Sequence, residues 1–329
     1  MMYNFTNIQM QGATHMPFTA KKQVYAARIH AVTLGTGEKR VILGGENVLP
    51  FHTFDAPIAN RPRIAAEISD RPWDDAGAPA LRAFYAGCGT MAERAARAAT
   101  LPGVDAVCLR FESADPNAGD MPVEECVRLA KEVADAVDVP ILVMGCKSPE
   151  KDAALFAAVS EALEGRNILI LSAREENYRT VGASATLEHN QVVGAESAVD
   201  INLAKQLNVL LSQMGVPAES VCMDVGSAAA GYGFEYLAST MDRIRLAALA
   251  QSDAQLQMPI VTPVSPETWV VKESTAPEEE NPGWGDVEER AIEMEVCTAS
   301  ACLVSGSNMV ILRHPEAISA VARFIDSLM

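Results

Sequence analysis

Short apolar runs alternate with stretches of helical spacing over most of the chain. The runs start near Ile64, Ala106, Pro140, Asn167, Gln191, Ser220, Pro259 and Met309. In the stretches between and after them, apolar residues recur every three or four positions, as at Ile318, Val321 and Ile325. Strands that alternate with helices predict a parallel sheet. Eight such units predict an α/β fold of the eight-stranded parallel (β/α) TIM-barrel type, with a doubly wound open sheet as the alternative.

The stretch 196–245 shows this repeat most clearly. Ser197 and Asp200 have the spacing of a capping box, which predicts that Ser197 caps the next helix. A short apolar strand follows at 221–225. A loop of small residues at 226–233 then leads into another helix and allows a ligand or partner to approach the backbone closely.

The N-terminal part of the chain does not follow the repeat. Residues 1–17 are polar and irregular, which indicates an arm. Two strand-like runs at 23–34 and 40–43 are joined by Gly-Thr-Gly-Glu-Lys, a pattern typical of a hairpin. We expect this hairpin to plug one end of the barrel, outside the ring of eight strands. The predicted domains are therefore an N-terminal arm and hairpin extension at 1–62 and a TIM barrel at 63–329.

Charge and composition exclude several partners. The formal net charge is −17, which argues against nucleic acid and anionic membrane lipids. No apolar run approaches the length of a membrane span, and the N-terminus lacks the order of a secretion signal. Seven cysteines without such a signal indicate free thiols in a reducing compartment, so we predict a cytoplasmic protein.

Polar residues gather at the predicted strand ends, where barrels of this type place function. They are Glu67, Asp70, Glu112, Asp115, Lys147, Ser172, Asn177, Ser197, Asp224 and His314. Paired carboxylates suit acid–base chemistry or metal binding, but Asp and Ser at strand-to-helix turns are more often helix caps. A long acidic segment at 265–290 is expected to overhang the mouth of the barrel, with Trp269 and Trp284 fixing it to the rim.

Familiar catalytic and cofactor motifs are absent from the sequence. It contains no phosphate-binding GxxxxGK[ST] loop, no HExxH and no GxSxG elbow. The cysteines lack the spacing of zinc or iron–sulfur ligands. We therefore predict that this chain binds no iron–sulfur cluster or other metal and supplies no catalytic residue.

Five stretches resemble the small, or delta, subunit of the corrinoid iron–sulfur protein of the carbon monoxide dehydrogenase/acetyl-CoA synthase system. They are GGENVLPFHTFDAPIANRPRIAAEISD at 44–70, SAREENY at 172–178, SAVDINLAKQLN at 197–208, GYGFEYLASTMDRIR at 231–245 and NPGWG at 281–285. The similarity covers nearly the whole chain after the arm. The sequence departs from the family at 227–230, where Gly-Ala-Leu is expected, and in the stretch after the seventh strand.

The resemblance implies a methyl-group carrier built on a TIM barrel. In such proteins a larger subunit forms a heterodimer with this one, carries the iron–sulfur cluster and holds the corrinoid against the mouth of the barrel. The corrinoid cobalt takes a methyl group from a methyl-tetrahydropterin through a methyltetrahydrofolate-type methyltransferase. It delivers the methyl group to acetyl-CoA synthase in the reductive acetyl-CoA pathway. The barrel would be a non-catalytic subunit that caps the shared corrinoid (cobamide).

The loops after the fourth to sixth strands are then predicted to face the corrinoid. The predicted cofactor-binding residues are Ser172, Asn177, Ser197, Asn202, Gly231, Tyr232 and Gly233. Helix N-termini in these loops suit the amide oxygens or phosphate of a cobamide, and the tyrosine adds a ring that can stack. The alternative for each residue is that it only caps a helix or tightens a turn.

Two other functions remain open at the level of sequence. A stand-alone pterin-binding methyltransferase, a related barrel, would hold its pterin with Asp and Asn at strand ends. The residues that allow this interpretation are Asp70, Asp115, Asn177, Asn202 and Asp224. A purely architectural subunit of the acetyl-CoA decarbonylase/synthase complex would differ only in not touching the corrinoid.

Overall fold

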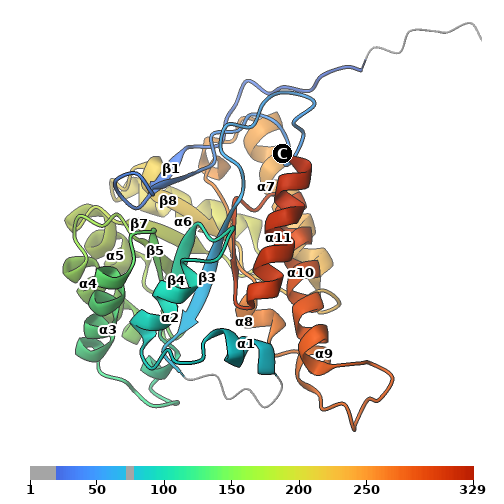
Figure 1. Ribbon diagram of the computed structural model, residues 1–329. Coiled ribbons are helices and arrows are strands. Elements are labelled where there is room, and N and C mark those ends of the chain that lie inside the picture. Colours follow the sequence, from blue (N-terminus) through green and yellow to red (C-terminus); the bar gives the residue numbers. More distant parts are fainter. Residues whose placement is uncertain (1–19, 72–77) are drawn as a thin grey trace, which may run out of the picture.

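Eight parallel strands form the barrel in the computed structural model, which describes residues 20–71 and 78–329 (Figure 1). The strands are β3 (Arg63–Ser69), β4 (Ala106–Arg110), β5 (Ile141–Met144), β6 (Leu169–Ala173), β7 (Val192–Glu196), β8 (Val221–Asp224), β9 (Val261–Pro263) and β10 (Met309–Leu312). Their hydrogen-bonded order is β8-β7-β6-β5-β4-β3-β10-β9, and a bridge between Met223 and Ile260 brings β8 beside β9. The predicted barrel is confirmed, with every strand starting within two residues of the expected position.

Helices between the strands cover the outside of the barrel. They are α1 (Pro79–Phe84), α2 (Met91–Ala98), α3 (Val123–Ala136), α4 (Pro149–Ala162), α5 (Tyr178–Val181), α6 (Ile201–Gln213), α7 (Phe234–Ala250), α8 (Ser265–Thr268), α9 (Lys272–Thr275), α10 (Val287–Ser305) and α11 (Pro315–Leu328). Local sequence sets their starts: Thr90 and Glu93 form a reciprocal capping box at α2. No helix within the described ranges is both long and apolar enough to cross a membrane.

The predicted cap of α6 is wrong. Asp200, not Ser197, is the N-cap, and its Oδ1 accepts hydrogen bonds from the backbone N–H groups of Asn202 (2.7 Å) and Leu203 (3.3 Å). The reason is an intervening turn at 198–199, which separates Ser197 from the helix. Ser197 instead continues the strand pairing, because its N–H donates to the carbonyl of Asp224.

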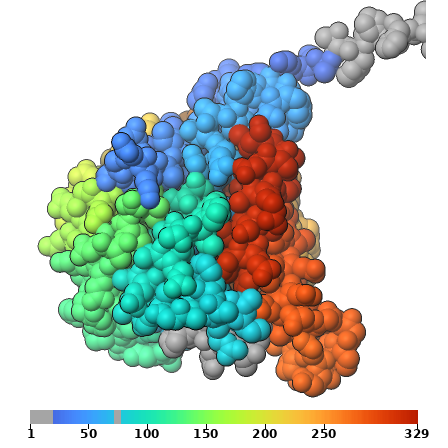
Figure 2. Space-filling view, viewed as in Figure 1, coloured from blue at the N-terminus to red at the C-terminus, as the bar shows by residue number. Residues whose placement is uncertain are grey.

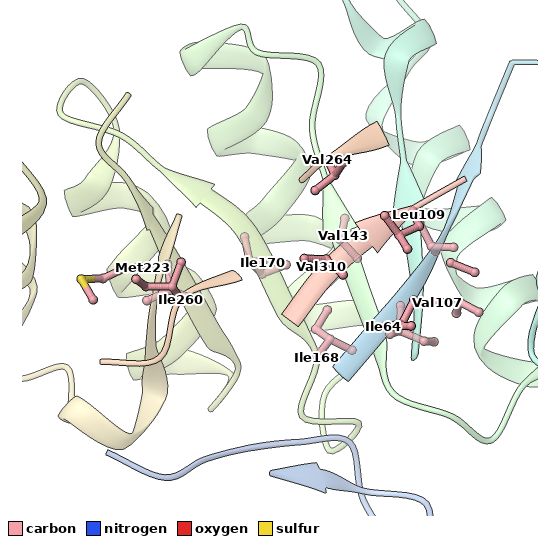
Figure 3. Packing of buried hydrophobic residues seen from close by; sticks show 14 of the residues in the cluster. Ile64, Val107, Leu109, Val143, Ile168, Ile170, Met223, Ile260, Val264 and Val310 are labelled. Carbon is pink, nitrogen blue, oxygen red and sulfur yellow. The ribbon is translucent and has the colours of Figure 1, made fainter. Parts of the chain in front are cut away.

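Side chains alternate along the barrel strands and build two apolar layers. One set points outward and packs under the helices, and Figure 3 shows Ile64, Val107 and Val143 from three neighbouring strands within this cluster. The residues next to them along the strands, such as Ala65 and Cys108, point inward and fill the barrel. Successive residues of a strand therefore belong to different layers, as the two-residue period requires.

An N-terminal hairpin closes one end of this inner layer. Strands β1 (Val32–Leu34) and β2 (Val41–Leu43) pair antiparallel in a sheet of their own, which confirms that the hairpin lies outside the ring. Val32, Leu34, Val41 and Leu43 join the inward-facing residues of the barrel in one cluster. The N–H of Gly35 donates to the carbonyl of Asn167, just before β6, so the hairpin sits at the N-terminal ends of the strands.

We expect the hairpin to contribute strongly to stability. Leu43→Ala should lower the free energy of unfolding by about 2–5 kcal/mol, because Leu43 is buried against the barrel interior. The matched control is Ile42→Ala on the same strand, where the side chain is only partly buried. Urea unfolding of both variants measures the difference. Equal losses would show that the hairpin does not pack into the barrel as described.

Candidate functional site

A layer of polar side chains lies above the apolar interior, at the C-terminal ends of the strands. Each member follows an inward-facing apolar or small residue by two positions, so it also points inward. The members of this polar layer are Glu67 on β3, Arg110 on β4, Glu196 on β7, Asp224 on β8 and Arg313 directly after β10. The opposite end is closed by the hairpin, so this layer forms the floor of the mouth.

Glu67 is the centre of one half of the polar layer. Its side chain is fully buried, and its Oε1 accepts hydrogen bonds from Nη2 (2.7 Å) and Nε (3.0 Å) of Arg313. Its Oε2 accepts from the hydroxyl of Ser265 (2.6 Å) and lies 3.6 Å from Nη1 of Arg110. Burial would raise the pKa of Glu67, but the charges of Arg313 and Arg110 outweigh it and hold the pKa below its usual value.

The same network reaches the C-terminal helices. Glu295 of α10 accepts hydrogen bonds from the backbone N–H groups of Arg313 (2.6 Å) and His314 (3.1 Å), and burial raises the pKa of Glu295 to about 7. His314 Nδ1 accepts from the N–H of Glu316 and caps α11, while its Nε2 lies 3.1 Å from Glu288. His314 is therefore a hydrogen-bonded residue at the start of α11, and the polar groups in this half of the mouth are paired with one another.

A cavity of about 250 Å³ opens over the other half of the polar layer. Its lining comes from the ends of β5 to β9: Met144, Gly145, Lys147, Asp152, Leu171, Ser172, Arg174, Glu196, Ala198, Val199, Asp224, Gly226, Ser227, Pro263, Pro266 and Glu267. We call it the mouth cavity. A second cavity of about 170 Å³ shares Met144, Gly145 and Lys147 with it and extends toward Arg71 and Asp115.

Hydrogen bonds fix the carboxyl groups of the mouth cavity. Asp224 accepts from the hydroxyl of Ser172 (2.6 Å) and from the N–H of Gly226 (3.0 Å). Arg174 donates through Nε to Glu196 (2.8 Å). Burial and the nearby charge of Glu196 raise the pKa of Asp224 well above its ordinary range. The floor therefore holds a carboxyl group that keeps its proton more readily than an exposed aspartate.

Only one of the seven predicted cofactor-binding residues, Ser172, lines the mouth cavity. Asn177 is buried and supports the β6 loop, since it accepts from the N–H of Arg174 and donates to the carbonyl of Pro149. Asn202 is exposed on the first turn of α6. Ser197 is fully buried beside the cavity without lining it.

The Gly-Tyr-Gly turn lies on the rim rather than in the cavity. Gly231 and Gly233 have φ values of 87° and 86°, a left-handed backbone that favours glycine. Tyr232 between them is 49% exposed, and its hydroxyl donates to Glu273 at 2.6 Å. The turn thus ties the loop after β8 to the acidic segment after β9.

Sequence reasoning missed several lining residues, chiefly Arg174, Glu196 and Glu267. A signal for Glu196 was present, since it directly ends the apolar run that starts near Gln191. The residues considered for a pterin are scattered: Asp224 lines the mouth cavity and Asp115 the second one, whereas Asp70, Asn177 and Asn202 line neither.

The acidic segment after β9 projects from one side of the mouth (Figures 1 and 2). Trp269 stacks on His314, with ring centroids 5.9 Å apart, and lies under the guanidinium of Arg313. It fixes the start of the segment to the polar layer, as predicted. Trp284 lies under the cations of Lys272 and Arg290, which belong to the acidic segment itself, and it remains 41% exposed. Within residues 20–71 and 78–329, no group of three or more His, Cys, Asp or Glu side chains could hold a metal ion.

The fold and the mouth define a TIM barrel with a cavity at the C-terminal strand ends. Dihydropteroate synthase from Yersinia pestis, solved with a sulfonamide drug complex, shares this fold: the TM-score is 0.54 with 14% identity, over 81% of this chain and 93% of that one.

The sequence relatives are more specific. The family described as CO dehydrogenase/acetyl-CoA synthase delta subunit matches residues 31–314. The acetyl-CoA decarbonylase/synthase complex subunit delta of Archaeoglobus fulgidus is 33% identical over 94% of this chain and 71% of its own length. The subunit of the same name from Methanopyrus kandleri is 35% identical over 89% of this chain and 71% of its own length. The chain therefore belongs to the CO dehydrogenase/acetyl-CoA synthase delta subunit family, which confirms the resemblance found in the sequence.

Proposed function

We propose that the chain is a non-catalytic delta subunit of an acetyl-CoA decarbonylase/synthase complex. Its mouth would cap a corrinoid held by a larger subunit that carries the iron–sulfur cluster. The observation that carries the proposal, beside family membership, is the pairing within the polar layer. Glu67 is neutralised by two arginines, and Arg174 by Glu196. Because these charged side chains are paired with one another, such a floor would orient a ligand and limit its contact with water. The reactive centre would then belong to the ligand and not to a side chain of this protein.

The lining of the mouth cavity fits part of a corrinoid. Apolar side chains of Met144, Leu171, Pro263 and Pro266 stand beside polar groups, and the buried hydroxyl of Ser227 has no hydrogen-bond partner among the described residues. A corrinoid is apolar over its ring faces and carries amide groups at its edge. When bound, it supplies a cobalt atom that takes up and releases a methyl group.

In this proposal the protein takes part in a series of methyl transfers in the cytoplasm. A methyltetrahydrofolate-type methyltransferase would load the corrinoid, and acetyl-CoA synthase would receive the methyl group. The net charge of −17 supports protein partners with basic surfaces rather than nucleic acid or membranes. No observation at the mouth favours a stand-alone pterin-binding enzyme, because the candidate Asp and Asn residues do not converge on one cavity.

Co-expression with the larger subunit of the same organism tests the function. The two chains should elute together as a heterodimer that holds corrinoid, seen by its visible absorbance. The larger subunit alone should retain less corrinoid or transfer methyl groups more slowly. If the heterodimer forms but corrinoid content and methyl transfer do not depend on this chain, its role is architectural. Separate elution of the two chains would contradict the proposal altogether.

The rim gives a second expected result. Tyr232→Ala combined with Asn202→Ala should leave the heterodimer intact but reduce corrinoid retention or slow methyl transfer several-fold. The reason is that Tyr232 lies in the loop after β8 and Asn202 on the first turn of α6, both at the mouth end of the barrel. The control is Leu246→Ala, which removes an exposed apolar side chain (44% exposed) from the distant end of α7. Equal behaviour of the two variants would leave these rim residues with a structural role only.

A further inference from the structure

The cations of the mouth cavity are already matched with carboxylates. Both cations in its lining have carboxylate partners: Arg174 pairs with Glu196 at 2.8 Å, and Lys147 with Glu267 at 3.3 Å. Asp224 is bound by a hydroxyl and a backbone N–H, and its raised pKa reduces its charge near neutral pH. Asp152, the remaining carboxyl group of the lining, accepts a hydrogen bond from the N–H of Cys146 (2.7 Å), and burial raises its pKa. The cavity therefore disfavours a phosphate, because it would find no unmatched cation and would face the carboxyl groups of Asp152 and Asp224.

Two hydrogen-bonding groups in the lining have no partner. The hydroxyl of Ser227 is buried and forms no hydrogen bond in the described part of the chain. The backbone N–H of Ala198 donates to no acceptor within residues 20–71 and 78–329. A buried polar group without a partner costs about 1–3 kcal/mol, so the hydroxyl of Ser227 points to a ligand that supplies an acceptor. The N–H of Ala198 belongs to an exposed residue of the lining, so it carries no such cost but can be reached by the same ligand.

The backbone around Ala198 holds this wall in an unusual conformation. Ala198 and Val199 have φ values of 44° and 65°, and a left-handed backbone is rare for a β-branched residue. The N–H of Val199 donates to the carbonyl of Val225 (2.8 Å), which fixes the turn against the β8 loop. A left-handed backbone is energetically unfavourable for such residues. It persists where the surrounding structure enforces it, often at ligand sites.

Donors and acceptors face the same space. Ser227 and Asp224 both line the mouth cavity, and the N–H of Gly226, the residue before Ser227, donates to Asp224. Around them the walls are apolar, with Leu171, Pro263 and Pro266. At about 250 Å³, the cavity is smaller than the roughly 300 Å³ at the lower end of sites for drug-sized molecules. It suits a projecting side group better than a whole macrocycle.

We propose that the mouth cavity binds an uncharged primary carboxamide side chain. Its carbonyl oxygen accepts from the hydroxyl of Ser227 and the N–H of Ala198, its NH₂ donates to Asp224, and its methylene groups lie against the prolines. A primary amide offers two donors and one acceptor in one small neutral group, which matches this lining. The inference rests on the proposed function in naming the source, since a corrin ring carries such amide side chains at its edge.

The test measures binding of two corrinoids to the full chain by equilibrium dialysis: cobinamide, whose ring side chains are amides, and cobyrinic acid, in which they are carboxylates. Cobinamide should bind at least tenfold more tightly. Ser227→Ala should weaken cobinamide binding about three- to tenfold, the effect of one neutral hydrogen bond. The control is Ser274→Ala, which removes another buried, unpartnered hydroxyl outside the cavity and should change nothing.

Propionamide provides a probe that does not depend on the corrinoid. Ligand-observed NMR should detect its binding to the wild-type chain and show a weaker signal with Ser227→Ala. If this holds but no corrinoid accompanies the complex, the carboxamide site stands and the proposed function fails. If the heterodimer holds corrinoid but cobinamide and cobyrinic acid bind equally, or Ser227→Ala has no effect, the inference is overturned. Binding of 2-amino-4-hydroxypteridine without any of propionamide would identify a heterocycle site and also overturn it.

Discussion

Arg313→Met should lower the free energy of unfolding by about 3–5 kcal/mol, the largest loss expected from a single polar substitution in this chain. Arg313 donates two hydrogen bonds to Glu67, whose side chain has no exposed surface. Methionine keeps much of the side-chain volume but removes the cation. The carboxylate of Glu67 is then left with the more distant Arg110, at 3.6 Å, and the hydroxyl of Ser265.

Two further variants show whether the loss comes from the unpaired charge. Glu67→Gln combined with Arg313→Met should recover part of the stability, because no buried carboxylate remains. Arg128→Met removes an exposed arginine that pairs with Glu125 and Glu132 on α3, and it should leave the urea midpoint almost unchanged. If Arg313→Met is as mild as Arg128→Met, the network around Glu67 does not hold the mouth together.

Asp224→Asn should stabilise the protein above neutral pH, by on the order of 2 kcal/mol at pH 8. Burial, with the charge of Glu196, raises the native pKa of Asp224 above its value in the unfolded chain. The native state thus binds this proton more tightly, and the stability it contributes is lost as pH rises through the native pKa. Asparagine carries no charge, and it can still accept from Gly226 and exchange a hydrogen bond with Ser172.

Urea midpoints between pH 5 and pH 9 measure this effect. The wild type should lose stability as pH rises, and Asp224→Asn should show a flatter profile. Asp138→Asn serves as a control, because the pKa of Asp138 is shifted in the opposite direction. The hydrogen bond from Lys39 lowers the pKa of Asp138, so any stability it contributes is lost only as pH falls through that lowered value. Parallel profiles for wild type and Asp224→Asn would show that Asp224 is ionised in the native state like an exposed carboxyl.

The barrel could be predicted from the sequence because its signal is local and repeated. Strand runs and helical spacing are set by which side chains must be buried, and each of the eight units carries its own copy of that pattern. The hairpin could also be predicted, since the Gly-Thr-Gly-Glu-Lys sequence between residues 34 and 40 is typical of a turn that joins two antiparallel strands. The cap of α6 was not, because Ser197 and Asp200 both suit an N-cap and only the turn at Ala198 decides between them.

The site was harder to predict because it depends on contacts between distant strands. Glu67 was recognisable as a polar residue near a strand end, but its partner Arg313 lies 246 positions later in the chain. Likewise, Ser172 was selected for its place in a loop, whereas its role comes from Asp224, 52 positions away. Tyr232 and Asn202 looked equivalent to Ser172 in the sequence, yet side-chain direction placed neither in the cavity. Such pairings follow from barrel register, which the pattern of single residues does not encode.

The hairpin at the N-terminal end gives the barrel a single opening. Within residues 20–71 and 78–329, Leu34 and Leu43 pack with the inward-facing side chains of the barrel, and the N–H of Gly35 binds the carbonyl of Asn167, so the hairpin covers this end of the barrel interior. A molecule held at the mouth must arrive and depart on the same side. If a partner covers that side, as in the proposed function, the residence time of the molecule is governed by how often the two proteins separate or swing apart, and not by its own affinity alone. Exchange kinetics of the ligand would then report the opening rate of the complex.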